Sequence, residues 1–125
     1  MKQLAIKENH LFAKAYSKGK RCVCKSISVF VLTDYAAGRL AAADPEKKLR
    51  NRVGVAVPKK IGGAVDRNRA KRLIRESYRL IEKEKRVRHG RLVVIAAREG
   101  ICENGMREVR RELEYALKKL DMILP

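Results

Sequence analysis

A dense run of basic side chains between positions 67 and 75 is the part of this sequence best suited to chemistry. The run reads Arg-Asn-Arg-Ala-Lys-Arg-Leu-Ile-Arg and holds five cations in nine positions. At the roughly 100° per residue of an α-helix, its polar side chains share one broad face. The residues predicted on that face are Arg67, Asn68, Lys71, Arg72, Arg75 and Arg79. Cations held this close repel one another, and a polyanion such as a phosphate backbone relieves the repulsion.

The opposite side of the same segment is apolar, which predicts an amphipathic helix with one buried face. We expect this helix from about Asp66 to Val87, with Asp66 as its N-cap. The residues predicted to be buried are Ala70, Leu73, Ile74, Ser77, Leu80 and Ile81. A basic face that is merely solvated is the alternative. The many arginines favour binding, because the planar guanidinium grips phosphate with two hydrogen bonds.

The composition of the whole chain also indicates a polyanionic partner. The 125 residues include 31 Lys and Arg against 14 Asp and Glu, a formal net charge of +17, as in nucleic-acid-binding proteins. A basic membrane-surface protein usually presents Trp or Phe on an amphipathic helix, whereas this chain has no Trp and two Phe. No segment has the length of a membrane span or the apolar core of a signal peptide. With an odd number of cysteines, three, we expect free thiols and a cytoplasmic protein that does not contact membrane.

Candidate catalytic groups are few. No paired carboxylates are spaced for two-metal phosphoryl chemistry, and the two histidines, His10 and His89, have no evident partner. The acids of the basic helix lie three or four residues from cations, which predicts ion pairs such as Arg72 with Glu76. The sequence therefore predicts no catalytic residue, although a self-sufficient nuclease stays an alternative that only an activity measurement excludes.

Hydrophobic periodicity predicts one small domain covering residues 1–125. A first helix is expected over residues 9–18, capped by Asn9 and ended by a left-handed Gly19. Strands are expected at 27–32, 52–57 and 92–97, with the last buried on both faces. Residues 33–51 read as a hairpin loop, and Asn104 as the cap of a final helix. This order predicts an α+β sandwich, one sheet with helices packed mainly on one face.

Residues 52–76 closely resemble a signature of the protein subunit of bacterial ribonuclease P. The pattern is a strand, the Lys59-Lys60 turn, a glycine, and then Arg-Asn-Arg-x-Lys-Arg-x-x-Arg-Glu. Phe12 and Tyr16, which precede Gly19, resemble the N-terminal aromatic pair of that family. The resemblance extends over roughly residues 4–120, so it covers nearly the whole chain.

The resemblance implies a fold like the second domain of ribosomal protein S5, with the order α-β-β-(β)-α-β-α and one mixed sheet. It also implies a left-handed strand–helix–strand crossover through the basic helix. Physical preference alone predicts the opposite hand, which about 98% of such connections adopt.

The function implied by the resemblance is that of a subunit which joins a catalytic RNA and assists endonucleolytic removal of the 5′ leader from precursor tRNA. The chemistry would belong to the RNA and to Mg²⁺ held mainly by that RNA. The expected partners are the ribonuclease P RNA, in a 1:1 complex with a protein monomer, and precursor tRNA. A structural RNA-binding protein of the ribosomal type is the alternative, and the ordered motif favours ribonuclease P.

Two binding surfaces follow from the resemblance. The surface expected to contact the catalytic RNA comprises Lys59, Lys60, Arg67, Asn68, Arg69, Lys71, Arg72 and Arg75. The cleft expected to bind the single-stranded leader comprises Phe12, Tyr16 and Phe30, which would stack on bases; the alternative is that these aromatics are core residues. Ala56 and Pro58 depart from the family, which often carries hydroxyl residues there, so the contacts of the leader at these positions are in doubt.

Overall fold

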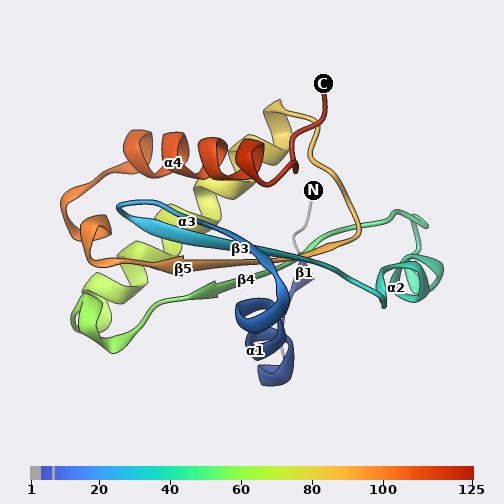
Figure 1. Cartoon of the computed structure of the whole chain (residues 1–125), viewed down its shortest axis with the longest axis horizontal. Coiled ribbons are helices and arrows are strands. Elements are labelled where there is room, and N and C mark those ends of the chain that lie inside the picture. Colours follow the sequence, from blue (N-terminus) through green and yellow to red (C-terminus); the bar gives the residue numbers. More distant parts are fainter. Residues whose placement is uncertain (1–3, 7) are drawn as a thin grey trace.

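The computed structural model describes residues 4–6 and 8–125, and its chain forms one five-stranded sheet covered by helices (Figure 1). The elements in chain order are β1 (Leu4–Ala5), α1 (Asn9–Lys18), β2 (Lys20–Val23), β3 (Ile27–Thr33), α2 (Ala37–Ala43), β4 (Arg52–Ala56), the 3₁₀ turn η1 (Lys59–Ile61), α3 (Ala64–Glu84), β5 (Arg91–Ala97), the 3₁₀ turn η2 (Glu99–Glu103) and α4 (Met106–Lys119).

The sheet is mixed and has the strand order β1-β4-β5-β3-β2. Strand β5 lies at its centre, parallel to β4 and antiparallel to β3, with Val93 opposite both Val53 and Val31. Its apolar residues are almost entirely buried, which confirms the prediction of a strand covered on both faces. Hydrophobic burial on both sides explains why this segment lacks the polar alternation of an exposed strand.

Helices cover both faces of the sheet, in unequal amounts. In Figure 1, α3 and α4 lie together over one face and α1 lies alone against the other. The larger core packs between the sheet and the two long helices and includes Ile74, Tyr78 and Leu113. A smaller core, which includes Ala15 and Phe30, packs beneath α1. The prediction of helices mainly on one face is confirmed, and α1 supplies the third layer.

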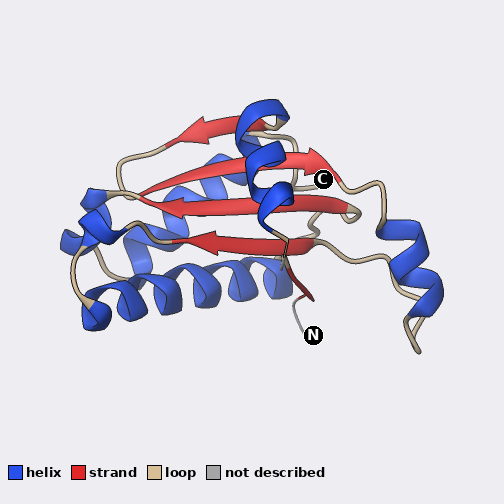
Figure 2. Cartoon of the chain, turned by 90° about the horizontal axis from the view of Figure 1, so that it is seen from below, coloured by secondary structure: helices blue, strands red, loops and turns tan. Residues whose placement is uncertain are grey.

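The connection from β4 through α3 to β5 is left-handed. In Figure 2 the two parallel strands point the same way and β5 lies above β4, while α3 runs along the lower edge of the sheet, on the far face that it shares with α4 in Figure 1. A right-handed crossover with the helix behind would place β5 on the other side of β4. The hand implied by the family resemblance is therefore present, and the general preference for the right-handed form is overridden here.

The segment predicted as a hairpin loop instead contains a short helix, α2. Five of its seven residues are Ala or Leu, which are strong helix formers. The prediction of a loop gave more weight to the turn-forming residues in this segment than to that helix propensity. The segment is anchored at both ends. The guanidinium of Arg52 donates to Asp34 at 2.7 Å, and the amide of Asn51 donates to the hydroxyl of the buried Tyr78 at 3.1 Å. The short strands β1 and β2 were also not predicted individually.

Three predicted helix ends differ from the structure. Gly19 is extended (φ −73°, ψ 154°) rather than left-handed, because the chain passes directly into β2. Helix α3 begins after Gly63, so Asp66 lies in its first turn, where a carboxylate interacts favourably with the helix dipole. Helix α4 begins after Gly105, whose N–H donates to Glu108 at 3.0 Å. The amide of Asn104 instead donates to Ser26 and Glu112.

Candidate nucleic-acid interface

Helix α3 presents its basic face to solvent because its apolar face is fixed against the sheet. The buried residues are Ala70, Ile74, Ser77, Tyr78 and Ile81. Leu73 and Leu80, predicted to be buried, are half-buried, and Tyr78 was missing from the predicted stripe. The helix starts after the turn η1, where Gly62 has a φ of 145° that favours glycine. This turn holds Lys59 and Lys60 close to the first residues of the helix.

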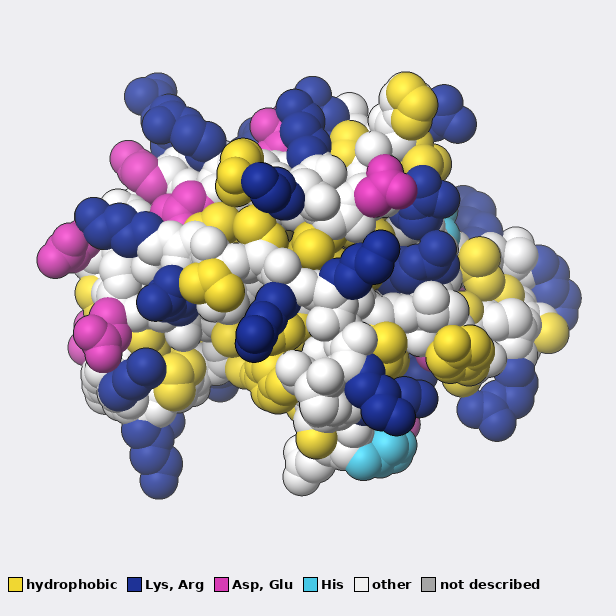
Figure 3. Space-filling view, viewed as in Figure 1, with side chains coloured by type: hydrophobic (Ala, Val, Ile, Leu, Met, Phe, Trp, Pro, Cys, Tyr) yellow, Lys and Arg dark blue, Asp and Glu magenta, His cyan; other side chains and the backbone are white. Residues whose placement is uncertain are grey.

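The predicted RNA-contact residues are largely accessible and are not neutralised by acids. Six of the eight are exposed, and Arg67 and Lys71 are half-buried. Among the described residues, none of the ion pairs involves any of these side chains. Basic side chains are also abundant elsewhere: Figure 3 shows many Lys and Arg, and far fewer acids, over the face that carries β2, α1 and α4. The positive charge of the helix is therefore free to meet an anion.

Arg69 differs from its neighbours because it also ties two elements together. Its Nη1 donates to the carbonyl of Ile101 at 3.2 Å, and its Nη2 donates to the carbonyl of Asn104 at 2.6 Å. These bonds join α3 to the segment that precedes α4. Sequence reasoning gave no sign of this contact, since the partners are more than thirty residues away. Asn68 is exposed and makes no side-chain hydrogen bond within the described part of the chain, which leaves its amide available to a ligand.

Tyr16 and Phe30 line one pocket on the α1 side of the sheet. Their rings meet edge to face with centroids 4.8 Å apart, and the pocket has a volume of about 480 Å³. Tyr16 is 39% exposed and Phe30 is 9% exposed, so the tyrosine ring is the accessible one. Burial raises the pKa of the Tyr16 hydroxyl, which keeps this group neutral and able to donate a hydrogen bond at physiological pH. The remaining lining residues are Ser28, Ala56, Val57, Pro58, Lys60, Ala96, Ala97 and Arg98.

Phe12 does not share this pocket. Its ring lies against the backbone of Gly54, so closely that a methyl group added to this glycine would approach Phe12 Cζ to 2.6 Å. It lines a neighbouring cavity of about 260 Å³ together with Val55 and Arg75. The three predicted cleft aromatics are thus divided between two adjoining cavities, and Phe12 and Phe30 are also partly core residues.

The aromatic pockets and the basic helix meet across strand β4. Arg75 of α3 lines the cavity of Phe12, and Lys60 of η1 lines the pocket of Tyr16. Two residues predicted for the RNA-contact surface therefore border the predicted leader cleft. A single strand lying on the aromatic rings would have cations within reach of its phosphates.

Two further lining residues of the Tyr16 pocket were missed from the sequence. Ser28 lies two positions before Phe30 and on the same face of β3, so the alternation of side chains along a strand could have identified it. Arg98 comes directly after β5 and was read only as part of a turn. Ala56 and Pro58 do line this pocket, so the departures from the family fall where a ligand would lie. The hydroxyl of Ser28 is one donor that the pocket retains.

Two acids of the basic helix, Glu76 and Glu84, are engaged by cations. Glu76 accepts from Nε of Arg79 at 3.2 Å, not from Arg72 as predicted, because the arginine three residues later reaches it. This hydrogen bond lowers the pKa of Glu76, the opposite of what a general acid needs. Glu84 pairs with Arg110 of α4. Within the described residues, no group of three or more His, Cys, Asp and Glu side chains is placed to hold a metal ion.

Fold and surface together define a small α+β protein whose accessible basic helix and adjoining aromatic pockets are suited to single-stranded and folded RNA. Over residues 4–6 and 8–125, the structure contains no helix long and apolar enough to cross a bilayer. The sequence profile of the Ribonuclease P family matches residues 1–121. The chain belongs to this family.

Individual relatives agree over nearly their full length. The chain is 34% identical over 121 residues to the ribonuclease P protein component of Bacillus mycoides, covering 97% of this chain and 94% of that protein. It is 32% identical over 124 residues to the component from Shouchella clausii, covering 99% and 91%.

Solved structures share the fold. The RNase P protein of Staphylococcus aureus superposes with a TM-score of 0.77 at 24% identity, covering 98% of this chain and all of that one. The RNase P protein of Thermotoga maritima gives a TM-score of 0.66 at 21% identity, covering 92% and 94%.

Proposed function

We propose that this protein is the protein subunit of ribonuclease P and assists the removal of the 5′ leader from precursor tRNA. The observation that carries the proposal is the junction of two surfaces across β4. The basic surface formed by η1 and α3 and the pair of aromatic pockets share Lys60 and Arg75 at their borders. This arrangement suits a protein that holds a folded RNA and a single strand at the same time.

The basic helix would bind the phosphate backbone of the catalytic RNA. Lys59, Arg72 and Arg75 are exposed and unpaired within the described chain, so no internal ion pair must break before they meet phosphate. Arginine offers two parallel N–H donors to each phosphate. Binding of this kind releases counterions. For each phosphate contacted, the logarithm of the affinity therefore falls by about 0.7–0.9 for each tenfold increase in salt concentration.

The Tyr16 pocket would bind the leader. A base that stacks on an accessible aromatic ring gains about 1–3 kcal/mol without regard to its identity, which suits leaders of varied sequence. Lys60 and Arg98 line the same pocket, and these cations would contact the phosphates next to a stacked base. The neutral hydroxyl of Tyr16 adds no repulsion toward that backbone.

We also propose that the RNA carries the chemistry and that Mg²⁺ is held mainly by the RNA. The engagement of Glu76 and Glu84 in ion pairs supports this division, because neither carboxylate is free to act as a base or as a metal ligand. One protein monomer would join one RNA in the cytoplasm, where tRNA precursors are made.

Reconstitution tests the proposal. The purified protein is mixed with a ribonuclease P RNA and labelled precursor tRNA at a Mg²⁺ concentration too low for the RNA alone. Restored cleavage at the mature 5′ end is the expected result. A protein that binds the RNA without restoring cleavage would be a structural RNA-binding protein. Cleavage by protein freed of RNA would instead place the chemistry on the polypeptide.

A further inference from the structure

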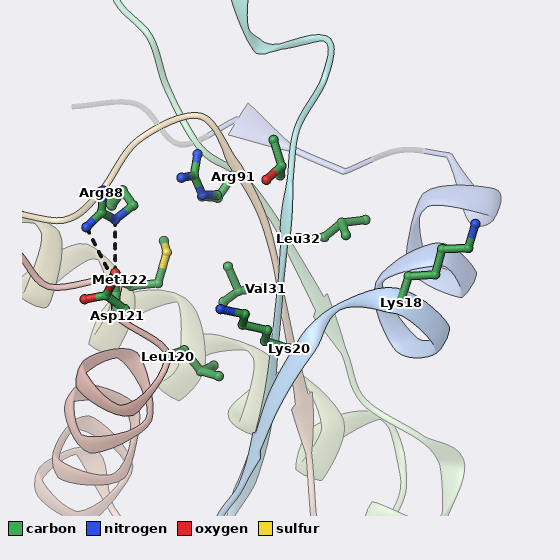
Figure 4. Close-up of a pocket in the computed structure, with 10 residues that line it drawn as sticks. Lys18, Lys20, Val31, Leu32, Arg88, Arg91, Leu120, Asp121 and Met122 are labelled. Atoms are coloured by element: carbon green, nitrogen blue, oxygen red, sulfur yellow. Dashed lines mark hydrogen bonds and ion pairs between the residues drawn. The ribbon is translucent and has the colours of Figure 1, made fainter.

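A second pocket lies at the opposite end of the sheet from the Tyr16 pocket, where β3 ends and β5 begins. Its volume is about 370 Å³. The apolar side chains of Val31, Leu120 and Met122 form part of its wall, and Figure 4 shows basic side chains arranged around them. The pocket lies on the side of the sheet that carries α4, away from the predicted leader cleft. None of the residues assigned above to RNA or leader binding lines it.

The charges around this pocket are mostly uncompensated. Its lining includes four cations, Lys18, Lys20, Arg88 and Arg91, against the single carboxylate of Asp121, an excess of three positive charges. In Figure 4 the ammonium group of Lys20 extends toward the pocket, while Lys18 points away from it on α1. Lys20 has no ion pair or side-chain hydrogen bond within the described residues.

Arg91 and Arg88 differ in how far they are engaged. Nη1 of Arg91 donates only to the neutral carbonyls of His89 and Gly90, at 3.3 and 3.4 Å, so its charge remains. Arg88 lies 3.6 Å from the Asp121 carboxylate, a side chain that is 86% exposed. An exposed pair of this kind contributes little. Lys20 and Arg91 are therefore the cations that an incoming anion would meet.

The pocket is too far from the predicted leader cleft to be part of it. Strand β5 runs from Arg91, which lines this pocket, to Ala97, which lines the Tyr16 pocket. At about 3.3 Å per residue the six steps between them span roughly 20 Å. An RNA bound to both ends of the sheet would thus be held at two separated points, which restrains its orientation as well as its position.

We propose that this pocket, centred on Lys20 and Arg91, binds a backbone phosphate of RNA as an electrostatic site distinct from helix α3. The inference rests on the proposed function, which supplies RNA as the partner. Phosphate is favoured over other anions because the pocket is lined by a guanidinium, an ammonium and the hydroxyl-bearing Thr33, while the apolar wall accommodates a ribose. The phosphate belongs either to the ribonuclease P RNA or to precursor tRNA, and the experiment separates the two.

The test compares three full-length proteins. They are the wild type, the pocket variant Lys20→Gln/Arg91→Gln, and the control Lys83→Gln/Lys118→Gln, which removes the same charge from exposed positions outside the pocket. One arm measures the affinity of each protein for ribonuclease P RNA over a salt series. The other arm measures the affinity of each reconstituted holoenzyme for precursor tRNA over the same series. The single variant Lys20→Gln, on an exposed edge strand, accompanies them in case Arg91→Gln impairs folding.

One of the two RNAs is expected to supply the phosphate. For that RNA, the pocket variant should bind about tenfold more weakly than the wild type, and the slope of log affinity against log salt should become shallower by about one. The control is expected to stay within about twofold in both arms, and Lys20→Gln to show a smaller loss with unchanged thermal unfolding. Equal losses for the pocket variant and the control in both arms would overturn the proposal. The proposal would also be overturned if the wild type bound polyglutamate more tightly than the pocket variant while the two proteins bound each RNA equally. A wild type that binds neither RNA would contradict the proposed function itself.

Discussion

Arg69 and Arg72 lie three positions apart on the exposed face of α3 and are expected to respond differently to the same substitution. Arg69 donates two hydrogen bonds to the segment before α4, whereas Arg72 has no protein partner within the described chain. Arg69→Gln should therefore weaken both the fold and RNA binding. Arg72→Gln should weaken RNA binding alone.

The size of the stability difference follows from the two bonds. A hydrogen bond contributes about 0.5–1.5 kcal/mol net, and the bond to Asn104 is solvent-exposed, so most of the effect comes from the part-buried bond to Ile101. We expect Arg69→Gln to lower the free energy of unfolding by about 1 kcal/mol. For a domain near this size that corresponds to a decrease in Tm of roughly 4 °C.

The assay is thermal and urea unfolding of the protein without RNA, followed by circular dichroism, beside RNA affinity over a salt series. Both variants should reduce the salt slope by up to one unit, and only Arg69→Gln should shift Tm. Identical Tm values for the two variants would show that the bonds of Arg69 do not stabilise the fold. Unchanged RNA affinity for Arg72→Gln would show that this part of the basic face is merely solvated.

Two further outcomes follow from other parts of the molecule. Tyr16→Ala should weaken binding of precursor tRNA to the holoenzyme by about 1–3 kcal/mol and leave mature tRNA binding nearly unchanged, with Tyr16→Phe as the control that keeps the ring; equal losses for both tRNAs would indicate damage to the core. Burial alone would raise the pKa of Asp34, but hydrogen bonds from Arg52 and the Ala36 N–H outweigh it and lower the pKa. The stability that this lowered pKa contributes is present above the ordinary value of about 3.9 and lost as pH falls through the lower folded-state value. Denaturation measured from pH 6 to pH 2 should show that loss in the wild type and a flatter profile in Asp34→Asn.

Much of the fold could be predicted because its main elements carry strong periodic patterns. The apolar stripe of α3 and the unbroken apolar run of β5 each require one type of secondary structure and one kind of burial. Helix α2 escaped prediction because its seven residues lie between turn-forming residues and bury only Ala37. Tyr78 was not among the residues predicted to be buried, and its hydrogen bond with the distant Asn51 shows how a tyrosine can be fully buried there.

The candidate site was predictable in its residue types and only partly in its geometry. The cations of α3 could be placed on one face because helical spacing determines that face. The division of Phe12 from Tyr16 and Phe30 depends on Gly54, which lies on a strand more than forty residues away. The involvement of Arg98 depends on how β5 ends relative to β3. Such juxtapositions depend on the packing of the sheet, which no local pattern specifies.

The contact of Phe12 with Gly54 has a consequence for the whole N-terminal helix. Because the ring of Phe12 lies directly on the backbone of β4, the absence of a side chain on Gly54 determines how closely α1 approaches the sheet. Tyr16 lies one helical turn after Phe12, so its distance from the sheet depends on the same contact. The hydrogen that Gly54 carries in place of a side chain thus sets the height of Tyr16 above the sheet, and with it the depth of the pocket that Tyr16 lines.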